Sequence, residues 1–330
     1  MLFAKYAFTT IMEVRFLDFE KQVAELEKRI SDLRGLSNTK EVNITSEINK
    51  LEQKAQNMLK KIYKDLTPWQ KVQVARHEER PQFLDYVKEM AGDFEFFAGD
   101  RTFAEDLALL GGVGHFYGRP VVVIGQQKGN STESRLAHNF GMARPEGYRK
   151  AQRLIGLADK FGLPIVTFVN TSGAYPGIES EERGQSAAIA SCTLACVRAN
   201  VPIISVIIGE GGSGGAVAIA TANYVMMLEH SFYSVISPEG CASILWKTAK
   251  ANASAAAEQK LTAQDLYRLR IIDEILPEPV GGAHRDKAAA IKIVLDAIDR
   301  QLARFQPGEE ANFKRDRAAR FLKFGEKEAG

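Results

Sequence analysis

The stretch PIISVIIGEGGSGGAVAIATA, residues 202–222, joins a continuous apolar run to a series of small residues through a glycine-rich turn. A continuous apolar run that ends in turn residues is typical of a strand buried on both faces. The small residues that follow Ser213 favour a helix that packs closely against its neighbours. In this order of strand, turn and helix, the first amides of the helix have no internal partner and can donate hydrogen bonds to a ligand.

Strands and helices alternate on both sides of this stretch. Residues 147–162 and 181–200 have helical periodicity, whereas 164–170 and 223–228 are apolar runs of strand length. This alternation predicts an α/β fold with parallel strands and right-handed crossovers. An antiparallel hairpin is also predicted, with its turn at 117–120 and its second strand at 121–125. The later predicted elements are a short strand near 233–236, a helix from Pro238 with Ser237 as its N-cap, a helix capped by Thr262, a strand at 271–276 and two C-terminal helices.

The N-terminal part of the chain is predicted to be helical throughout. Apolar residues recur at spacings of three and four over residues 17–64, which predicts two antiparallel helices joined by the polar segment 35–43. Further helices are predicted from Pro68 and after Pro81. We therefore divide the chain into an N-terminal helical region at 1–92, a core at 93–285 and C-terminal helices at 286–330.

Composition and charge exclude several classes of protein. The 330 residues are 45% hydrophobic and 25% charged, which is ordinary for a globular protein, and the net charge of +2 gives no field for non-specific nucleic-acid binding. No apolar stretch reaches the roughly 18 residues that span a bilayer, and the leading MLFAKYAFTTIMEV lacks the features of a secretory signal, with Met12 as an alternative start. We expect a soluble protein of the cytoplasm, or of the plastid stroma in a plant or alga.

The three cysteines predict neither a disulfide framework nor a zinc site. Cys192 and Cys196 lie four residues apart in a helical pattern, and Cys241 is distant from both. No pair of histidines accompanies them. We expect these side chains to act as small apolar groups on buried helix faces.

Two known glycine patterns fit the turn, and each lacks a part. From Gly209 the turn matches the dinucleotide fingerprint, but it follows several strands and only Glu229 stands roughly where the acidic partner belongs. From Gly211 it matches the nucleophile elbow of esterases, in which Ser213 needs a histidine and an acid. The later candidate bases, His230 and His284, lie in unremarkable surroundings. His138, which precedes the serine, would give the order found in self-compartmentalising serine peptidases.

A third interpretation needs no nucleophile. The amides of Gly214 and Gly215, at the start of the helix, have the placement of an oxyanion hole, which stabilises negative charge that develops on a reacting oxygen. A second glycine turn, NTSGAYPG at 170–177, also follows a buried strand and is stiffened by Pro176. We expect the two turns to converge on one crevice at the carboxyl edge of the sheet, although each alone is also compatible with a tight turn of no functional role.

Longer blocks of the sequence resemble one protein family. The blocks are RPEGYRKAQRL at 144–154, GAYPGIESEERGQS at 173–186, VIIGEGGSGGA at 206–216, YSVISPEGCASILWK at 233–247 and LPEPVGGAHR at 276–285. With them, the chain resembles the α subunit of the carboxyltransferase of bacterial and plastid acetyl-coenzyme A carboxylase from about residue 17 to about residue 285. The resemblance implies a crotonase/ClpP-like spiral of ββα units with an N-terminal helical extension.

The resemblance also implies a reaction and partners. In this family, a carboxyl group moves from carboxybiotin, held on the biotin carboxyl carrier protein, to acetyl-coenzyme A, and the product is malonyl-coenzyme A for fatty acid biosynthesis. The active site lies between this subunit and a β subunit with a zinc ribbon, in an α2β2 assembly. A biotin carboxylase uses ATP to load the biotin, and no ATP or metal site is expected in this chain. A self-sufficient hydratase or peptidase and a non-catalytic scaffold remain the alternatives.

Carried onto this sequence, the resemblance implies specific site residues. Gly214 and Gly215 are the candidate oxyanion amides, and Gly173 and Ala174 line the cleft. The biotin ureido oxygen is favoured for the pair, with the thioester oxygen as the alternative. The candidate substrate-binding residues are Gly211, Gly212, Tyr175, Lys128 and Arg144.

Some prominent residues have a simpler structural interpretation. The family loop reads DTPGAYPG, so Asn170 and Ser172 depart from it and put the fine positioning of the loop in doubt. Lys128, Arg144, Arg149 and Lys150 are expected to be solvated surface charges rather than a basic rim. Trp69 and Trp246 are expected to be packing residues.

Overall fold

The computed structural model describes residues 15–36, 43–305 and 312–325, and it separates into two compact units, Met1–Asp65 and Leu66–Gly330. In the first unit, a short 3₁₀ helix, η1 (Asp18–Glu20), precedes α1 (Lys21–Leu36) and α2 (Asn43–Lys64), which pack together as the predicted helical pair. The leading residues with Met12, and most of the polar connection between the helices, lie outside the described residues. The buried apolar residues of these helices include Val23, Ile30, Ala55 and Leu59.

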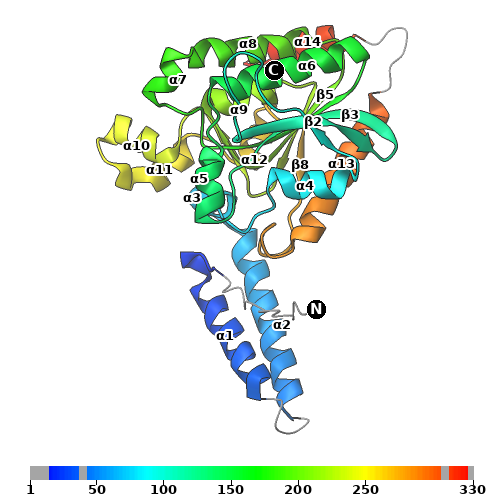
Figure 1. Cartoon of the computed structure of the whole chain (residues 1–330). Coiled ribbons are helices and arrows are strands. Elements are labelled where there is room, and N and C mark those ends of the chain that lie inside the picture. Colours follow the sequence, from blue (N-terminus) through cyan, green and yellow to red (C-terminus); the bar gives the residue numbers. More distant parts are fainter. Residues whose placement is uncertain (1–14, 37–42, 306–311, 326–330) are drawn as a thin grey trace, which may run out of the picture. The chain divides into compact units, whose positions relative to one another are not determined.

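The second unit is built on an eight-stranded sheet (Figure 1). β2 (Leu109–Phe116) and β3 (Arg119–Gln126) form the predicted hairpin, and Tyr117 and Gly118 turn the chain with φ of 47° and 78°. These positive φ values match the twist of the paired strands. β1 (Glu95–Phe96), which the sequence did not predict, pairs with β2.

The rest of the sheet is parallel, as predicted. From β3 the order continues through β4 (Ile165–Thr171), β5 (Ile203–Gly212), β6 (Tyr224–Leu228) and β8 (Glu274–Leu276). β7 (Phe232–Ser234) also pairs with β5, beyond the point where β6 stops pairing with it.

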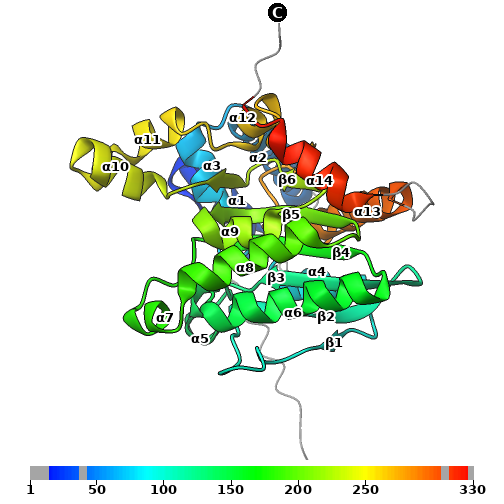
Figure 2. The same cartoon turned by 90° about the horizontal axis from the view of Figure 1, so that it is seen from above.

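Helices cover both faces of the sheet (Figures 1 and 2). One core lies under α6 (Pro145–Phe161), α8 (Gln185–Arg198) and α9 (Ser213–Ala220), and the other lies under α4 (Phe83–Met90) and α13 (Lys287–Arg304). Buried residues of β5 alternate between these two cores, which explains its continuous apolar sequence. The remaining helices are α3 (Pro68–Ala75), α5 (Thr132–Ala137), η2 (Asn139–Gly141), α7 (Ile178–Glu182), α10 (Pro238–Trp246), η3 (Ala249–Ala251), α11 (Asn252–Glu258), α12 (Ala263–Arg268) and α14 (Phe313–Leu322).

Local signals located several helix starts correctly. Pro68 occupies the first turn of α3, and Ser237, followed by Pro238, caps α10 by accepting a hydrogen bond from the Gly240 amide at 3.1 Å. Thr262 caps α12 in the same way. The helices α5 and α11, whose sequences carry weak periodicity, were not predicted.

The division into compact units falls between Asp65 and Leu66. α3, α4 and α13 belong to the second unit, where α4 and α13 pack against each other. The sequence boundaries at 92/93 and 285/286 stay predictions. None of the helices in the described parts of the chain has the length and apolar character to cross a membrane.

Two of the three cysteines lie where the sequence placed them. Cys192 and Cys196 are fully buried on α8, and both thiols approach the carbonyl of Ala218, at 3.3 and 3.5 Å. The hydrogen bond with Cys196 raises the pKa of the Cys192 thiol, and burial raises it further. Cys241, on α10, is only partly buried.

Candidate active site

The two glycine turns lie against each other at the carboxyl edge of the sheet. A Cβ atom on Gly212 would lie 2.3 Å from the carbonyl oxygen of Ser172, and one on Gly215 would lie 2.8 Å from the amide nitrogen of Ala174. Both distances are shorter than real Cβ contacts, so a side chain at either position would push the turns apart. The glycines are thus required by the close approach of the two turns, which the sequence predicted.

The start of α9 presents backbone amides that no side chain caps. Gly212 is the N-cap residue and makes no side-chain hydrogen bond, and Ser213, Gly214 and Gly215 form the first turn. Ser213 has φ of 53°, in the left-handed region, so the chain reverses sharply between the end of β5 and the helix. Gly214 is partly accessible, whereas Gly215 is buried.

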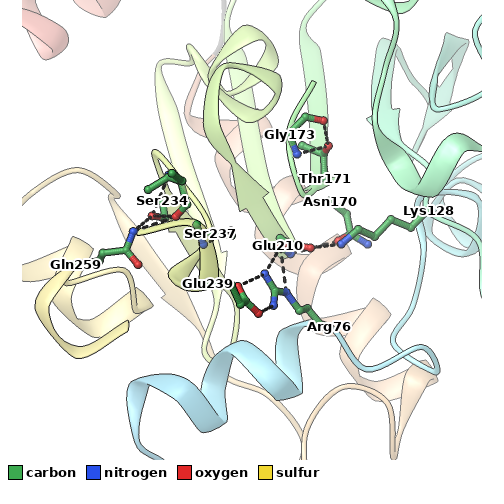
Figure 3. A network of polar contacts seen from close by, with 12 residues as sticks. Arg76, Lys128, Asn170, Thr171, Gly173, Glu210, Ser234, Ser237, Glu239 and Gln259 are labelled. Carbon is green, nitrogen blue, oxygen red and sulfur yellow. Dashed lines mark hydrogen bonds and ion pairs between the residues drawn. The ribbon is translucent and has the colours of Figure 1, made fainter. Parts of the chain in front are cut away.

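The second turn is stiffened by its own hydrogen bonds. The Gly173 amide donates to Thr171 Oγ1 at 3.0 Å, and that hydroxyl donates to the Gly173 carbonyl at 2.8 Å (Figure 3). Since its amide is occupied, Gly173 can line the cleft but does not offer the amide to a ligand. The Tyr175 amide donates to the carbonyl of Ala143 at 3.0 Å, which fixes the far side of the turn.

The predicted substrate-binding residues fall into two places. Arg144 lies over the Tyr175 ring, with its guanidinium carbon 4.9 Å from the ring centroid, beside the second turn. Lys128 follows β3 and forms an ion pair with Glu210. Gly211 and Gly212 belong to β5 itself, where they pair with Tyr233 and Ser234 of β7.

The expectation of solvated surface charge is wrong for Lys150. Its side chain is 1% exposed, and it pairs with Glu105 and donates to the Asp106 carbonyl at 2.8 Å. Arg149 is held by Asp100 at 2.7 Å. Both residues therefore form structural ion pairs, and they form no basic rim with Lys128 and Arg144.

An ion cluster that the sequence did not predict lies beside the glycine turns (Figure 3). Glu210, within the glycine-rich stretch, is paired with Lys128 and with Arg76, whose Nη2 is 2.8 Å from Oε1. Arg76 also contacts Glu239 of α10 at 2.6 Å. Burial alone would raise the pKa of Glu210, but the charges of Lys128 and Arg76 lower it below its usual value. The one available signal was a glutamate in a run of glycines.

Asn170, one of the departures from the family loop, lies next to this cluster. Its Oδ1 accepts a hydrogen bond from the Glu210 amide at 3.2 Å, and its Nδ2 donates to Gln82 Oε1 at 3.3 Å. An aspartate would keep the acceptor but lose the donor, and it would add a negative charge near the Glu210 carboxylate. With asparagine at position 170, the cluster holds two acidic residues, Glu210 and Glu239, and two basic residues, Lys128 and Arg76.

A pocket of about 250 Å³ opens beside the ion cluster. It lies where β3, β4 and β5 end, which is where open α/β sheets bind ligands. Of the predicted substrate-binding residues, Lys128 lines this pocket, and so does the second departure, Ser172. The lining residues are Ala75, Arg76, His77, Glu78, Gln82, Lys128, Gly129, Arg135, Phe140, Asn170, Ser172 and Glu210.

The geometry does not favour serine catalysis. Ser213 has the positive φ of a nucleophile elbow, but His138 directs Nδ1 to the Leu107 carbonyl at 2.7 Å, and His284 stacks on His77 at 3.9 Å. His230 is buried, and burial lowers its pKa. Among the described residues, no histidine forms a hydrogen bond with the Ser213 hydroxyl.

The dinucleotide interpretation also lacks its acidic partner. Glu229, at the end of β6, accepts a hydrogen bond from the Glu278 amide at 3.3 Å. Its carboxylate is therefore used to join β6 to the segment that follows β8. The start of α9, which no side chain caps, remains the chemical feature that both glycine patterns share.

Comparison with known proteins identifies relatives along almost the whole chain. Residues 16–325 match the family described as "Acetyl co-enzyme A carboxylase carboxyltransferase-like". A protein of Ruegeria pomeroyi, "Acetyl-coenzyme A carboxylase carboxyl transferase subunit alpha", is 56% identical over 314 residues, which are 95% of this chain and 98% of that protein. A protein of the same name from Rhodospirillum centenum is 55% identical over 318 residues, covering 96% of this chain and all of the relative.

Solved structures share the fold at low identity. The transcarboxylase 12S structure, described as a hexamer with methylmalonyl-coenzyme A bound, superposes with a TM-score of 0.55 and 18% identity, over 72% of this chain and 46% of that chain. The Pseudomonas malonate decarboxylase MdcD-MdcE hetero-dimer superposes with a TM-score of 0.54 and 16% identity, over 72% of this chain and 95% of that chain. These likenesses confirm the expected crotonase-like fold.

Proposed function

This chain belongs to the acetyl-coenzyme A carboxylase carboxyltransferase family, and on that premise we propose that it is the α half of a carboxyltransferase. The reaction moves the carboxyl group of carboxybiotin, on the biotin carboxyl carrier protein, to acetyl-coenzyme A. The product, malonyl-coenzyme A, begins fatty acid biosynthesis. The partners are a β subunit with a zinc ribbon, in an α2β2 assembly, and a biotin carboxylase that consumes ATP.

The observation that carries this proposal is the uncapped start of α9, pressed against the second glycine turn. Carboxyl transfer develops negative charge on two oxygens, first on the biotin ureido oxygen and then on the thioester oxygen of the acetyl group. Fixed amides stabilise such charge more strongly in the transition state than in the ground state. We assign the amides of Gly214 and Gly215 to one of these oxygens, with the ureido oxygen favoured.

The remaining site residues act around those amides. Gly173 and Ala174 line the cleft on the side of the second turn, and Gly173 contributes shape because its amide is bonded to Thr171. Arg144 and Tyr175, stacked beside the same turn, are our candidates for contacts with coenzyme A or the carrier. No protein base is required, because the nitrogen freed on biotin takes the proton from the acetyl methyl group.

Exposed apolar residues near the glycine turns support a shared site. Ile178 of α7 is 78% exposed, and Leu245 and Trp246 of α10 are 65% and 42% exposed. Trp69 packs against the core, as predicted, whereas Trp246 is exposed in this chain, so its predicted packing role requires a partner. α7 and α10 lie at the same end of the sheet (Figures 1 and 2). We propose that the β subunit covers this surface.

The proposal is tested by the reverse half-reaction, the carboxylation of free biotin by malonyl-coenzyme A. We expect this chain alone to be inactive and its mixture with a matching β subunit to be active. Activity of the chain alone would contradict a shared site and favour a self-sufficient enzyme. An assembled but inactive mixture would contradict the carboxyltransferase function.

A further inference from the structure

β5 carries an irregularity immediately before the glycine turn. Val169 of β4 is opposite Ile207, but Thr171 is opposite Gly211, so β5 has two extra residues across from Asn170. At the same point β5 changes its other neighbour, since its pairing with β6 ends at Ile207 and its pairing with β7 begins at Glu210. A bulge of this kind redirects the strand that follows it. Its shape therefore sets the direction of the amides at the start of α9.

Side chains from several elements hold the backbone of this bulge. Arg80, which follows α3, donates to the Ile208 carbonyl at 3.0 Å and is itself held by the buried Glu278 at 2.8 Å. Asn170 of β4 accepts a hydrogen bond from the Glu210 amide at 3.2 Å. Both ends of the extra segment are thus fixed through its backbone.

The Glu210 carboxylate adds a third attachment (Figure 3). It is joined to Lys128, at the end of β3, and to Arg76, at the end of α3. The Glu210 side chain is 4% exposed, so its charge is compensated by these two cations rather than by water. Loss of the carboxylate charge would leave Lys128 and Arg76 without their shared partner and would remove the ionic attachment of the bulge to β3 and α3.

We infer that Glu210 is a positioning residue for carboxyl transfer, which fixes the β5 bulge through Lys128 and Arg76 so that the Gly214 and Gly215 amides face the reacting oxygen. The inference rests on the proposed function, but Glu210 acts through the turn and needs no contact with substrate. Arg76 extends the attachment to Glu239, in the first turn of α10. Arg76 therefore connects the glycine turn to α10 through its ion pairs with Glu210 and Glu239.

The test compares Glu210→Gln with Glu146→Gln in the assembled complex with the β subunit. Glu146 is a matched control, because it is also a buried glutamate with two basic partners, Arg149 at 3.0 Å and Arg183 at 2.7 Å, but it lies on α6. For Glu210→Gln we expect kcat of the biotin half-reaction to fall about 10- to 100-fold, with KM for malonyl-coenzyme A within about two-fold, because misplaced groups cost rate rather than binding. For Glu146→Gln we expect both constants within about two-fold of the unmodified complex.

Hydrogen exchange provides a readout that does not depend on activity. Peptides that cover residues 206–216 should exchange faster in Glu210→Gln than in the unmodified complex, because this variant releases the bulge. In Glu146→Gln their exchange rate should not change. If Glu210→Gln does not assemble, Arg76→Gln replaces it with the same expectations, because it removes one partner of the carboxylate and leaves Lys128.

The outcomes separate this inference from the proposed function. A kcat within about two-fold of the unmodified complex, a change in KM alone, or equal exchange over 206–216 would each overturn the positioning role. An inactive unmodified complex would instead contradict the proposed function. In that case the exchange comparison still decides whether Glu210 fixes the bulge.

Discussion

Replacement of Gly215 by alanine tests the contact between the two glycine turns most directly. The new Cβ atom would lie 2.8 Å from the Ala174 amide nitrogen and 2.8 Å from the Gly173 carbonyl carbon, and 3.0 Å from Tyr148 Oη. Ordinary contacts begin at 3.4 Å, so the turns must separate by about 0.6 Å. The atoms in the way are mainly backbone, which cannot move aside as a flexible side chain would.

A displacement of this size should lower the catalytic rate strongly and should affect assembly only modestly. Misplacement by about 1 Å, or loss of one oxyanion donor, typically costs about 10² in rate. For Gly215→Ala we therefore expect kcat to fall about 10- to 100-fold, which is about 1.4 to 2.8 kcal/mol of transition-state stabilisation. For Gly214→Ala we expect a smaller loss, because its Cβ would meet only the Ile189 side chain, with Cγ2 at 3.4 Å and Cδ1 at 3.8 Å.

The assay is the biotin half-reaction of each variant, mixed with the β subunit and checked for assembly by size-exclusion chromatography. Gly156→Ala is the control, since nothing lies within 4 Å of a Cβ atom at that position on α6, and its activity should not change. Full activity of an assembled Gly215→Ala complex would refute the oxyanion role. A loss in Gly214→Ala as large as that in Gly215→Ala would refute the steric reasoning.

Three further predictions concern neighbouring residues. Ser213→Ala should keep kcat within about three-fold, because only backbone amides of the turn act, and loss of nearly all activity would restore the serine mechanism. The Glu210 carboxylate has a lowered pKa in the folded chain, so its stabilisation is fully present above the ordinary value of 4.5 and is lost as pH falls below it. The urea midpoint should accordingly depend less on pH between about 5 and 3 in Glu210→Gln, and an unchanged dependence would contradict that assignment. Trp246→Ser should weaken association with the β subunit in calorimetry without lowering the Tm of the isolated chain, because the ring is 42% exposed, and unchanged affinity would exclude α10 from the interface.

Local interactions explain why much of the fold could be predicted. The apolar runs of β4, β5 and β6, the two-residue turn at Tyr117 and Gly118, and the caps Ser237 and Thr262 are all set by residues close in sequence. The oxyanion interpretation of the glycine-rich stretch has the same origin, since an uncapped helix start is a local feature.

Contacts between distant residues decided what the sequence could not indicate. Glu210 contacts Lys128 and Arg76, which are 82 and 134 positions away in the sequence. A glutamate among glycines therefore acquires its partners only when three strand ends and α3 come together. Lys150 is buried against Glu105, although the sequence pattern suggested a solvated charge, and Trp246 is exposed in this chain, although a packing role was predicted for it. The sequence by itself determined which elements form and where amides are left unpaired. Tertiary structure decided which charges are compensated and which apolar surfaces stay open, because burial and ion pairing depend on what the rest of the chain brings to each residue.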